Sequence, residues 1–309
     1  MRVMGLVLPF VLLTPCSPGS LPAQNRVVAE FRIELERNRT IVPVTVGSSG
    51  PFRLVLDTGM PYDGILLYDT TGIDLTAFAQ PVPVQMRGAG DGGVSHGLSD
   101  EAGTFFVGPL RIEGQRITML TSEMFRGFPT DGVIGYTLLG HYAVEIDYDE
   151  NRLILYDART FAPEDGWVSL ELTFRENKVP WLAIDVATVD DEPVSLRTYI
   201  DFASRHAIEL LDRDTNAFNP PLLTGDSTTG RGMSGDVRGQ KGRVSTVRIG
   251  PFTLTDVTVN LVAAAVRSRQ PGADAVIGHD ALRRFNIVFD YAHNQVHLKP
   301  NDSFMEPFR

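Results

Sequence analysis

The sequence has very little cysteine, no run of basic residues and no long apolar segment. Cys16 is the only cysteine among 309 residues, which excludes a disulfide scaffold. The Lys and Arg residues are scattered and the net charge is -10, which argues against a nucleic-acid binder and against a basic membrane-surface patch. The sequence also has no glycine-rich phosphate-binding motif between a predicted strand and helix, and no G-x-S-x-G motif of a serine nucleophile. What remains is the composition of an ordinary globular protein, with 43% hydrophobic residues.

The N-terminal segment 1–23, MRVMGLVLPFVLLTPCSPGSLPA, is typical of a secretory signal peptide. Its apolar run is shorter than the about 20 residues that a membrane-spanning helix needs. A lipoprotein signal acylated at Cys16 is the alternative, and Pro15 directly before that cysteine disfavours it. We therefore expect cleavage after Ala23 and export to the periplasm or the medium, with no membrane span in the mature chain.

The rest of the sequence consists of two similar halves. Residues 131–148, DGVIGYTLLGHYAVEIDY, align without a gap to residues 274–291, DAVIGHDALRRFNIVFDY. A repeat of this length predicts two small domains rather than a solenoid. Further blocks recur in the same order, namely 52–59 with 195–203, 88–97 with 230–239, and 107–112 with 249–254.

Most of both halves is predicted to be β-strand. Apolar and polar residues alternate in segments such as FRIELE, FRLVLD, AVEIDY and NIVFDY, and Gly, Asn, Asp and Pro separate these segments. Short helices are expected only at 137–142 and 280–285. We predict an all-β fold of two similar β-barrel lobes, 24–160 and 161–309, related by a pseudo-twofold axis.

The sharpest local feature is LVLDTGM at 54–60, where an apolar strand ends in Asp57, Thr58 and Gly59. A carboxylate at the end of a buried strand needs hydrogen-bond partners, and a following glycine lets backbone amides approach it. Taken alone, the tripeptide is equally typical of an ordinary turn. The repeat changes this interpretation, because it aligns Asp57 with Asp201 of the second half.

Two lobes related by a twofold axis can bring Asp57 and Asp201 face to face. Two carboxylates within about 3 Å cannot both ionise, so they share a proton. The ionised carboxylate can then deprotonate a water molecule while the protonated one donates to a carbonyl oxygen. Such a pair hydrolyses an amide without a metal or a covalent intermediate.

The sequence resembles the aspartic peptidases of the retropepsin and pepsin group, and most of all bacterial exported proteins with two retropepsin-like units in one chain. The resemblance is carried by Asp57-Thr58-Gly59 and by the later Val-Ile-Gly tripeptides at 133–135 and 276–278. It implies a peptide or protein substrate, catalysis by Asp57 and Asp201, and no metal or other cofactor. It also implies that the Gly-rich segments are flaps over the substrate.

The resemblance further implies which residues contact substrate. By position these are Thr58 and Gly59 of the catalytic loop and one glycine in each flap, Gly90 and Gly232. We expect a monomer, since one chain carries both motifs. A homodimer that pairs two copies of Asp57, with the second lobe as scaffold, is a further possibility.

The second motif departs from the family pattern. It reads Asp201-Phe202-Ala203-Ser204, where the family has Asp-Thr-Gly or Asp-Ser-Gly. Phe202 has no hydroxyl to connect the two loops, and Ala203 adds a methyl group to a crowded backbone. The alternative to an endopeptidase is therefore an impaired protein of the same fold that binds a peptide or another polymer without cleaving it.

The histidines give weaker signals. His206 follows Asp201 by five residues, and an exposed or hydrogen-bonded structural histidine is the favoured interpretation. His293 and His297 lie on a predicted strand with no third ligand nearby, so a zinc site is not expected.

Overall fold

The computed structural model describes residues 25–308, except for a set of short segments and one longer one. The predicted signal peptide, 1–23, therefore lies outside the described residues. For 224–227, 229 and 267 only the backbone is described. The segments left out are 69–71, 74–77, 79, 91, 122–124, 126, 176–177, 189–191, 213–223 and 268–269.

The first half folds into an eight-stranded sheet. An additional pairing between its strands β3 and β7 closes this sheet on itself, and apolar residues such as Val42, Val44 and Leu54 are fully buried inside it. In spatial order the strands are β2 (Glu34–Leu35), β3 (Thr40–Val46), β4 (Ser49–Leu56), β9 (Gly132–Ile134), β5 (Gly64–Leu67), β8 (Leu110–Leu120), β7 (Ser95–Val107) and β6 (Val82–Met86).

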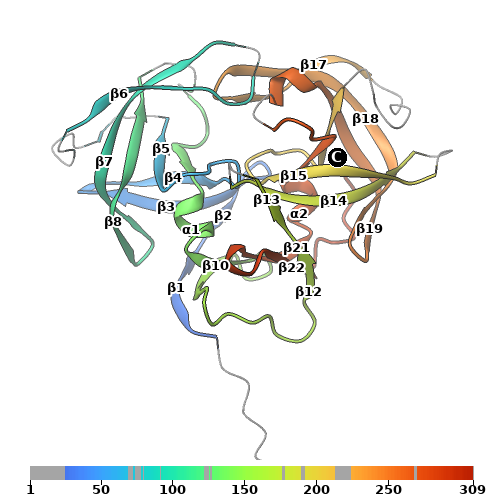
Figure 1. The fold of residues 1–309 in the computed structure, drawn as a ribbon, viewed down its shortest axis with the longest axis horizontal. Helices are drawn as coiled ribbons and strands as arrows, with labels where there is room; N and C mark the ends of the chain where they lie inside the picture. The colour runs from blue at the N-terminus through green and yellow to red at the C-terminus, as the bar shows by residue number, and fades with distance from the viewer. Residues whose placement is uncertain are drawn as a thin grey trace, which may run out of the picture.

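The second half repeats this topology strand for strand. Its sheet is closed by the pairing of β14 with β18, which matches β3 with β7. The two lobes lie side by side in Figure 1. In spatial order the strands are β13 (Thr173–Phe174), β14 (Pro180–Ala187), β15 (Val194–Asp201), β20 (Ala275–Gly278), β16 (Ile208–Asp212), β19 (Phe252–Ala263), β18 (Gly235–Ile249) and β17 (Thr224–Gly232).

A third, six-stranded sheet joins the two halves, with three strands from each. At its centre β10 pairs antiparallel with β21, so that Glu145 faces Val288. These two residues are also matched by the sequence repeat, as a twofold axis between the central strands requires. The order is β1 (Val27–Arg32), β11 (Arg152–Asp157), β10 (Tyr142–Asp147), β21 (Phe285–Asp290), β22 (Gln295–Pro300) and β12 (Val168–Glu171).

The helices of the described residues are short. The α-helices are α1 (Tyr136–Leu139) and α2 (His279–Leu282), and the 3₁₀ turns are η3 (Ala264–Arg267) and η4 (Tyr291–His293). Each α-helix follows its Val-Ile-Gly strand as predicted, but it ends earlier than expected because β10 and β21 already begin at Tyr142 and Phe285. Neither α-helix is long enough to cross a bilayer. The predicted all-β, two-lobed fold is confirmed.

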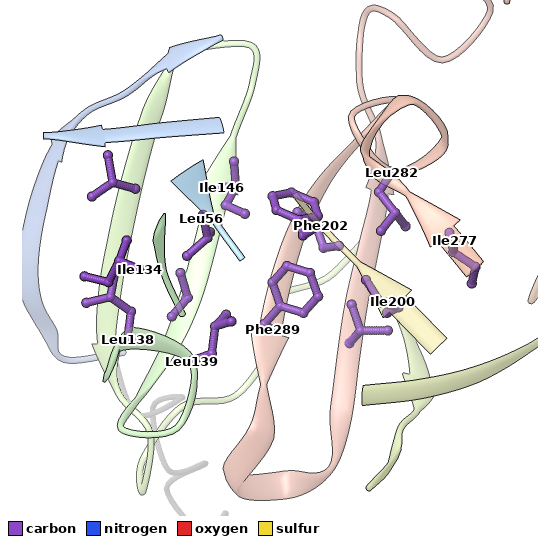
Figure 2. Close-up of a cluster of buried hydrophobic side chains, with 14 of the residues drawn as sticks. Leu56, Ile134, Leu138, Leu139, Ile146, Ile200, Phe202, Ile277, Leu282 and Phe289 are labelled. Atoms are coloured by element: carbon purple, nitrogen blue, oxygen red, sulfur yellow. The ribbon is translucent and has the colours of Figure 1, made fainter. Parts of the chain in front are cut away.

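One hydrophobic core extends through both lobes and lies behind the two aspartate loops. It contains Leu56 and Ile146 of the first half together with Phe202, Leu282 and Phe289 of the second. Figure 2 shows Phe202 and Phe289 in the middle of this cluster, with Leu56 on one side and Leu282 on the other. The shared core fixes the two loops relative to each other.

Candidate functional site

The two aspartates stand at the ends of matching strands. Asp57 directly follows β4, Asp201 ends β15, and each of these strands pairs in parallel with a Val-Ile-Gly strand, β9 or β20. The glycines of those tripeptides permit close packing of the loops. A Cβ atom at Gly135 would lie 2.2 Å from the Asp57 carbonyl oxygen, and one at Gly278 would lie 2.1 Å from that of His206.

Both aspartates line a single cleft of about 450 Å³ between the lobes. Backbone amides orient both carboxyl groups. The amide of Gly59 donates to Asp57 Oδ1 at 2.7 Å, and the amide of Ser204 donates to Asp201 Oδ1 at 3.1 Å. The equivalent loops of the two halves thus reach the same cavity within one chain.

The hydroxyl of Thr58 connects the two loops. It donates to the Ile200 carbonyl oxygen at 2.7 Å and accepts from the Phe202 amide at 2.9 Å. The sequence suggested that this connection would be lost, because Phe202 has no hydroxyl. The connection exists because one hydroxyl can both donate and accept, so Thr58 makes both bonds from its own side. Thr58 is 2% exposed and does not line the cleft, so it supports the loops from behind.

Phe202 points away from the cleft. Its side chain is fully buried, and its ring centroid lies 4.8 Å from that of His279 and 5.3 Å from that of Phe289. Phe202 is not among the residues that line the cleft. The substitution of Phe for a hydroxyl-bearing residue therefore fills the core and leaves the space before Asp201 open.

A buried carboxylate holds the second loop. The Ser204 hydroxyl donates to Glu209 Oε1 at 2.8 Å, and Glu209 on β16 is 3% exposed. Since the Ser204 amide binds Asp201, this pair links the Asp201 carboxyl to the barrel wall. The first loop has an apolar residue, Met60, at the position of Ser204 and is held differently.

Two hairpins cover the cleft. The β6–β7 hairpin of the first lobe and the β17–β18 hairpin of the second lie at the top in Figure 1. Their tips contact each other, since the Ser234 amide donates to the Ala89 carbonyl at 2.9 Å and the Ser95 hydroxyl donates to the Met233 carbonyl at 2.6 Å. Both Gly-rich segments are therefore placed as flaps would be.

The flap glycines are required where the tips touch. A Cβ atom at Gly232 would lie 2.3 Å from the Ala89 carbonyl oxygen, and Gly90 has a φ of +125° and packs on Gly235. Of the four residues predicted to contact substrate, Gly59 and Gly232 line the cleft. Thr58 and Gly90 contact the protein's own loops instead.

One wall of the cleft is aromatic. Tyr68 stacks on Phe125 with ring centroids 4.2 Å apart, and Phe128 lies edge-on to Phe125 at 5.3 Å. Burial raises the pKa of Tyr68, and the negative charge of Asp57 raises it further, so this phenol stays neutral. Such a wall suits apolar side chains of a ligand.

Arginines gather at one end of the same cleft. Arg39 and Arg205 line it, and Arg37 and Arg231 line an adjoining cavity of about 210 Å³. Burial, helped by the nearby charge of Arg205, lowers the pKa of Arg39 to about 10. Arg39 therefore keeps its positive charge at neutral pH.

Of the three histidines considered from the sequence, His206 lines the cleft. The other two contact the protein: His293 Nδ1 lies 2.7 Å from Asp290 Oδ2, and His297 Nδ1 lies 2.8 Å from the Ser169 hydroxyl. Within the described part of the chain no group of His, Cys, Asp and Glu side chains has the arrangement of a metal site.

The comparison with solved structures agrees with this architecture. No family model matches the sequence, and no curated protein is detectably similar to it. Among solved structures, the aspartic proteinase from Irpex lacteus is similar with a TM-score of 0.59, over 91% of this chain and 99% of that chain, at 12% identity. At this identity the likeness establishes the fold alone. The chain has the two-lobed fold of a pepsin-like aspartic proteinase.

Several residues that shape the cleft around the aspartates were not predicted from the sequence. They lie outside the repeated motifs, for example in the turn before β3, at Phe125 and Phe128, and on β16. A usable signal was Glu209, a carboxylate inside the otherwise apolar segment AIELL. The missed residues are Arg39, Phe125, Phe128, Arg205 and Glu209.

Proposed function

We propose that the protein is an aspartic-type endopeptidase, with Asp57 and Asp201 as its catalytic residues. The observation that carries the proposal is that these two aspartates, at the ends of matching strands, line one cleft beneath two flaps. The finer resemblance to bacterial proteins with two retropepsin-like units is part of the proposal, and the presence of a flap in each lobe supports it.

In the proposed reaction the ionised aspartate takes a proton from water as the water oxygen attacks the peptide carbonyl carbon. The protonated aspartate donates its proton to the carbonyl oxygen. In the tetrahedral intermediate the first carboxyl returns its proton to the amide nitrogen, the C–N bond breaks, and the second carboxylate recovers a proton from a hydroxyl group. Each aspartate ends in its starting state.

The flaps have a defined task in this proposal. Their tips are bonded to each other across the cleft, so they must separate to admit a polypeptide. Closed over a substrate, they exclude bulk water from the carboxyl pair and strengthen the electrostatic interactions there.

A peptide-library digest at several pH values, read by mass spectrometry, tests the proposal. Asp57→Asn and Asp201→Asn are each expected to lower peptide hydrolysis by at least about a thousandfold, because each removes one half of the acid–base pair. Asp63→Asn is the matched control, since Asp63 is exposed, pairs with His141 and lies outside the cleft. Hydrolysis that persists in Asp57→Asn would remove the assignment.

The second candidate function is binding without cleavage. The loss of a hydroxyl and a glycine at Phe202 and Ala203 favours it, because small displacements of a catalytic group cost about a hundredfold in rate. This alternative holds if the wild-type protein binds peptides in the digest mixture and leaves all of them intact.

The proposal also includes cleavage of the signal peptide after Ala23, export of the mature chain, and activity as a monomer. Fractionation of producing cells with N-terminal sequencing of the mature chain tests export and the cleavage position. Light scattering of the active species tests the monomer, and activity found only in a dimer would favour the homodimer model instead.

A further inference from the structure

The cleft continues into a second cavity at one end. The two cavities, of about 450 and about 210 Å³, share Arg39, Phe128, Arg205, Gly230 and Arg231 as lining residues. The first lobe supplies Arg39 and Phe128, and the second supplies the others. A polypeptide that lies across the aspartates and leaves the cleft at this end passes between the two lobes.

This end of the cleft is strongly positive in a protein of net charge -10. Four arginines and one carboxylate, Asp236, line the smaller cavity, and Asp236 already binds Arg231, with Nε and Oδ1 2.7 Å apart. Glu36 binds Arg53 and lies 3.9 Å from the Arg37 guanidinium.

Arg39 and Arg205, in contrast, are not paired with a carboxylate in the described part of the chain. Among the residues that the structure describes, no carboxylate lies within ion-pairing distance of either side chain. Arg39 is only 8% exposed, and its guanidinium carbon lies 5.2 Å from the Phe128 ring centroid. A buried charge without a counter-ion is costly, and a carboxylate that arrives with a ligand removes that cost.

The turn that precedes Arg39 is bonded to the loop that carries Arg205. The turn between β2 and β3 carries Arg37 and Asn38 at φ values of 47° and 55°, a conformation that tight hairpin turns require. The Asn38 side-chain amide donates to the Arg205 carbonyl oxygen at 3.3 Å. This bond joins the turn of the first lobe to the Asp201 loop of the second, so the Arg39–Arg205 pair is part of the inter-lobe architecture.

The arrangement is not repeated at the other end of the cleft. Pro61 stands four residues after Asp57, where Arg205 stands four residues after Asp201. The turn between β13 and β14 carries Lys178, and its ammonium lies 3.9 Å from the Tyr136 ring centroid rather than lining the cleft. The twofold symmetry of the fold therefore does not account for the arginine pair.

We propose that Arg39 and Arg205 form a carboxylate subsite, which selects peptides with an acidic group at one fixed position on one side of the scissile bond. The proposal rests on the proposed peptidase function and names its substrate class. Guanidinium groups bind carboxylates through paired hydrogen bonds, which gives a preference for Glu or Asp over their amides. Phe128, shared by both cavities, places an apolar wall beside this subsite.

Matched synthetic peptides test the subsite. A peptide cleaved in the library digest is prepared with Glu, Gln or Lys at the selected position, and each as a C-terminal acid and amide. We expect kcat/KM to be about 10- to 100-fold higher for Glu than for Gln, the size of a charge-assisted hydrogen bond. A preference that follows the C-terminal acid instead identifies the terminal carboxylate as the ligand group.

Variants of the pair separate binding from folding. Arg205→Gln should abolish the Glu preference, and Arg205→Glu should invert it so that the Lys peptide is cleaved best. Arg159→Gln, which removes an exposed arginine remote from the cleft, should keep the wild-type ratio. Equal cleavage of the Glu and Gln peptides by the wild type overturns the subsite while the peptidase function stands.

A binding measurement keeps the two proposals distinguishable. If the wild type cleaves nothing, the peptidase function fails, and the subsite is then tested by fluorescence anisotropy of the labelled Glu and Gln peptides. Tighter binding of the Glu peptide, lost in Arg205→Gln, supports the subsite. Equal affinities, or no binding at all, overturn it.

Discussion

The two aspartate loops achieve the same placement with different side chains. In the first loop the Thr58 hydroxyl makes two hydrogen bonds to the second loop. In the second loop Phe202 accepts one end of that connection through its backbone amide and sends its ring into the core. The loops meet at one cleft in spite of this asymmetry.

The two loops of a twofold-related pair can therefore be connected by a single hydroxyl group. Because a hydroxyl donates one hydrogen bond and accepts others, Thr58 can serve both partners alone. The matching position is then free for a residue that contributes packing. Departure from the family tripeptide at Phe202 is therefore compatible with two aspartates that line one cleft. Substitution of either Thr58 or Phe202 should then weaken the contact between the loops.

The largest effect is expected from making the loops symmetric by Phe202→Thr. The new hydroxyl replaces a fully buried ring in the shared core, so the free energy of unfolding should fall by about 3 kcal/mol. Phe202→Leu, which keeps most of the apolar volume, should cost about 1 kcal/mol. Urea unfolding measures both variants. If Phe202→Thr proves no less stable than Phe202→Leu, the ring is not the packing element described above.

Removing the Thr58 hydroxyl should have the next largest effect. Thr58→Val leaves the Ile200 carbonyl and the Phe202 amide unsatisfied, at a cost of about 2 kcal/mol in stability. Displacement of the loops should also lower peptide hydrolysis by about a hundredfold. Thr58→Ser keeps the hydroxyl and serves as control. Equal unfolding midpoints and rates for the two variants would mean that the connection contributes nothing.

The strands, the repeat and the aspartate positions could be predicted because each has a local signal. Alternation of apolar residues specifies strands, and the gapless match of 131–148 to 274–291 specifies two lobes of one topology. These signals need no knowledge of which segments meet in space.

The cleft walls could not be predicted, because they depend on contacts between distant segments. Arg39 and Arg205 are brought together only by the docking of the β2–β3 turn against the Asp201 loop. The direction of Phe202 likewise depends on His279 and Phe289, which lie far along the chain. A sequence gives the residue type at such a position without its orientation.

Beneath Phe202, the buried His279 should make the second lobe sensitive to acid. Burial, with smaller contributions from Arg283 and Arg39, lowers the pKa of His279 from 6.5 to about 3. Between these two values the unfolded chain binds a proton that the folded chain does not, so stability falls as the pH falls through this window. The loss from this group should be about 1.4 kcal/mol per pH unit, or about 2 kcal/mol at pH 5.

His279→Asn removes this titration and should flatten the profile of unfolding free energy between pH 7 and pH 5. A wild-type slope equal to that of His279→Asn would mean that His279 titrates alike in both states.

The smallest effect is expected at the hydrogen bond that is particular to the second loop. Ser204→Ala removes a donor from the Glu209 carboxylate, which is 3% exposed, and should lower the free energy of unfolding by about 1 kcal/mol. Peptide hydrolysis should fall by less than about tenfold, because the backbone amide of Ser204, which the substitution retains, binds Asp201. A double-mutant cycle with Glu209→Gln should give a coupling energy of about 1 kcal/mol. A coupling near zero would show that the Ser204–Glu209 hydrogen bond does not hold the second loop. Both loops would then be held in place by the Thr58 hydrogen bonds and by core packing alone.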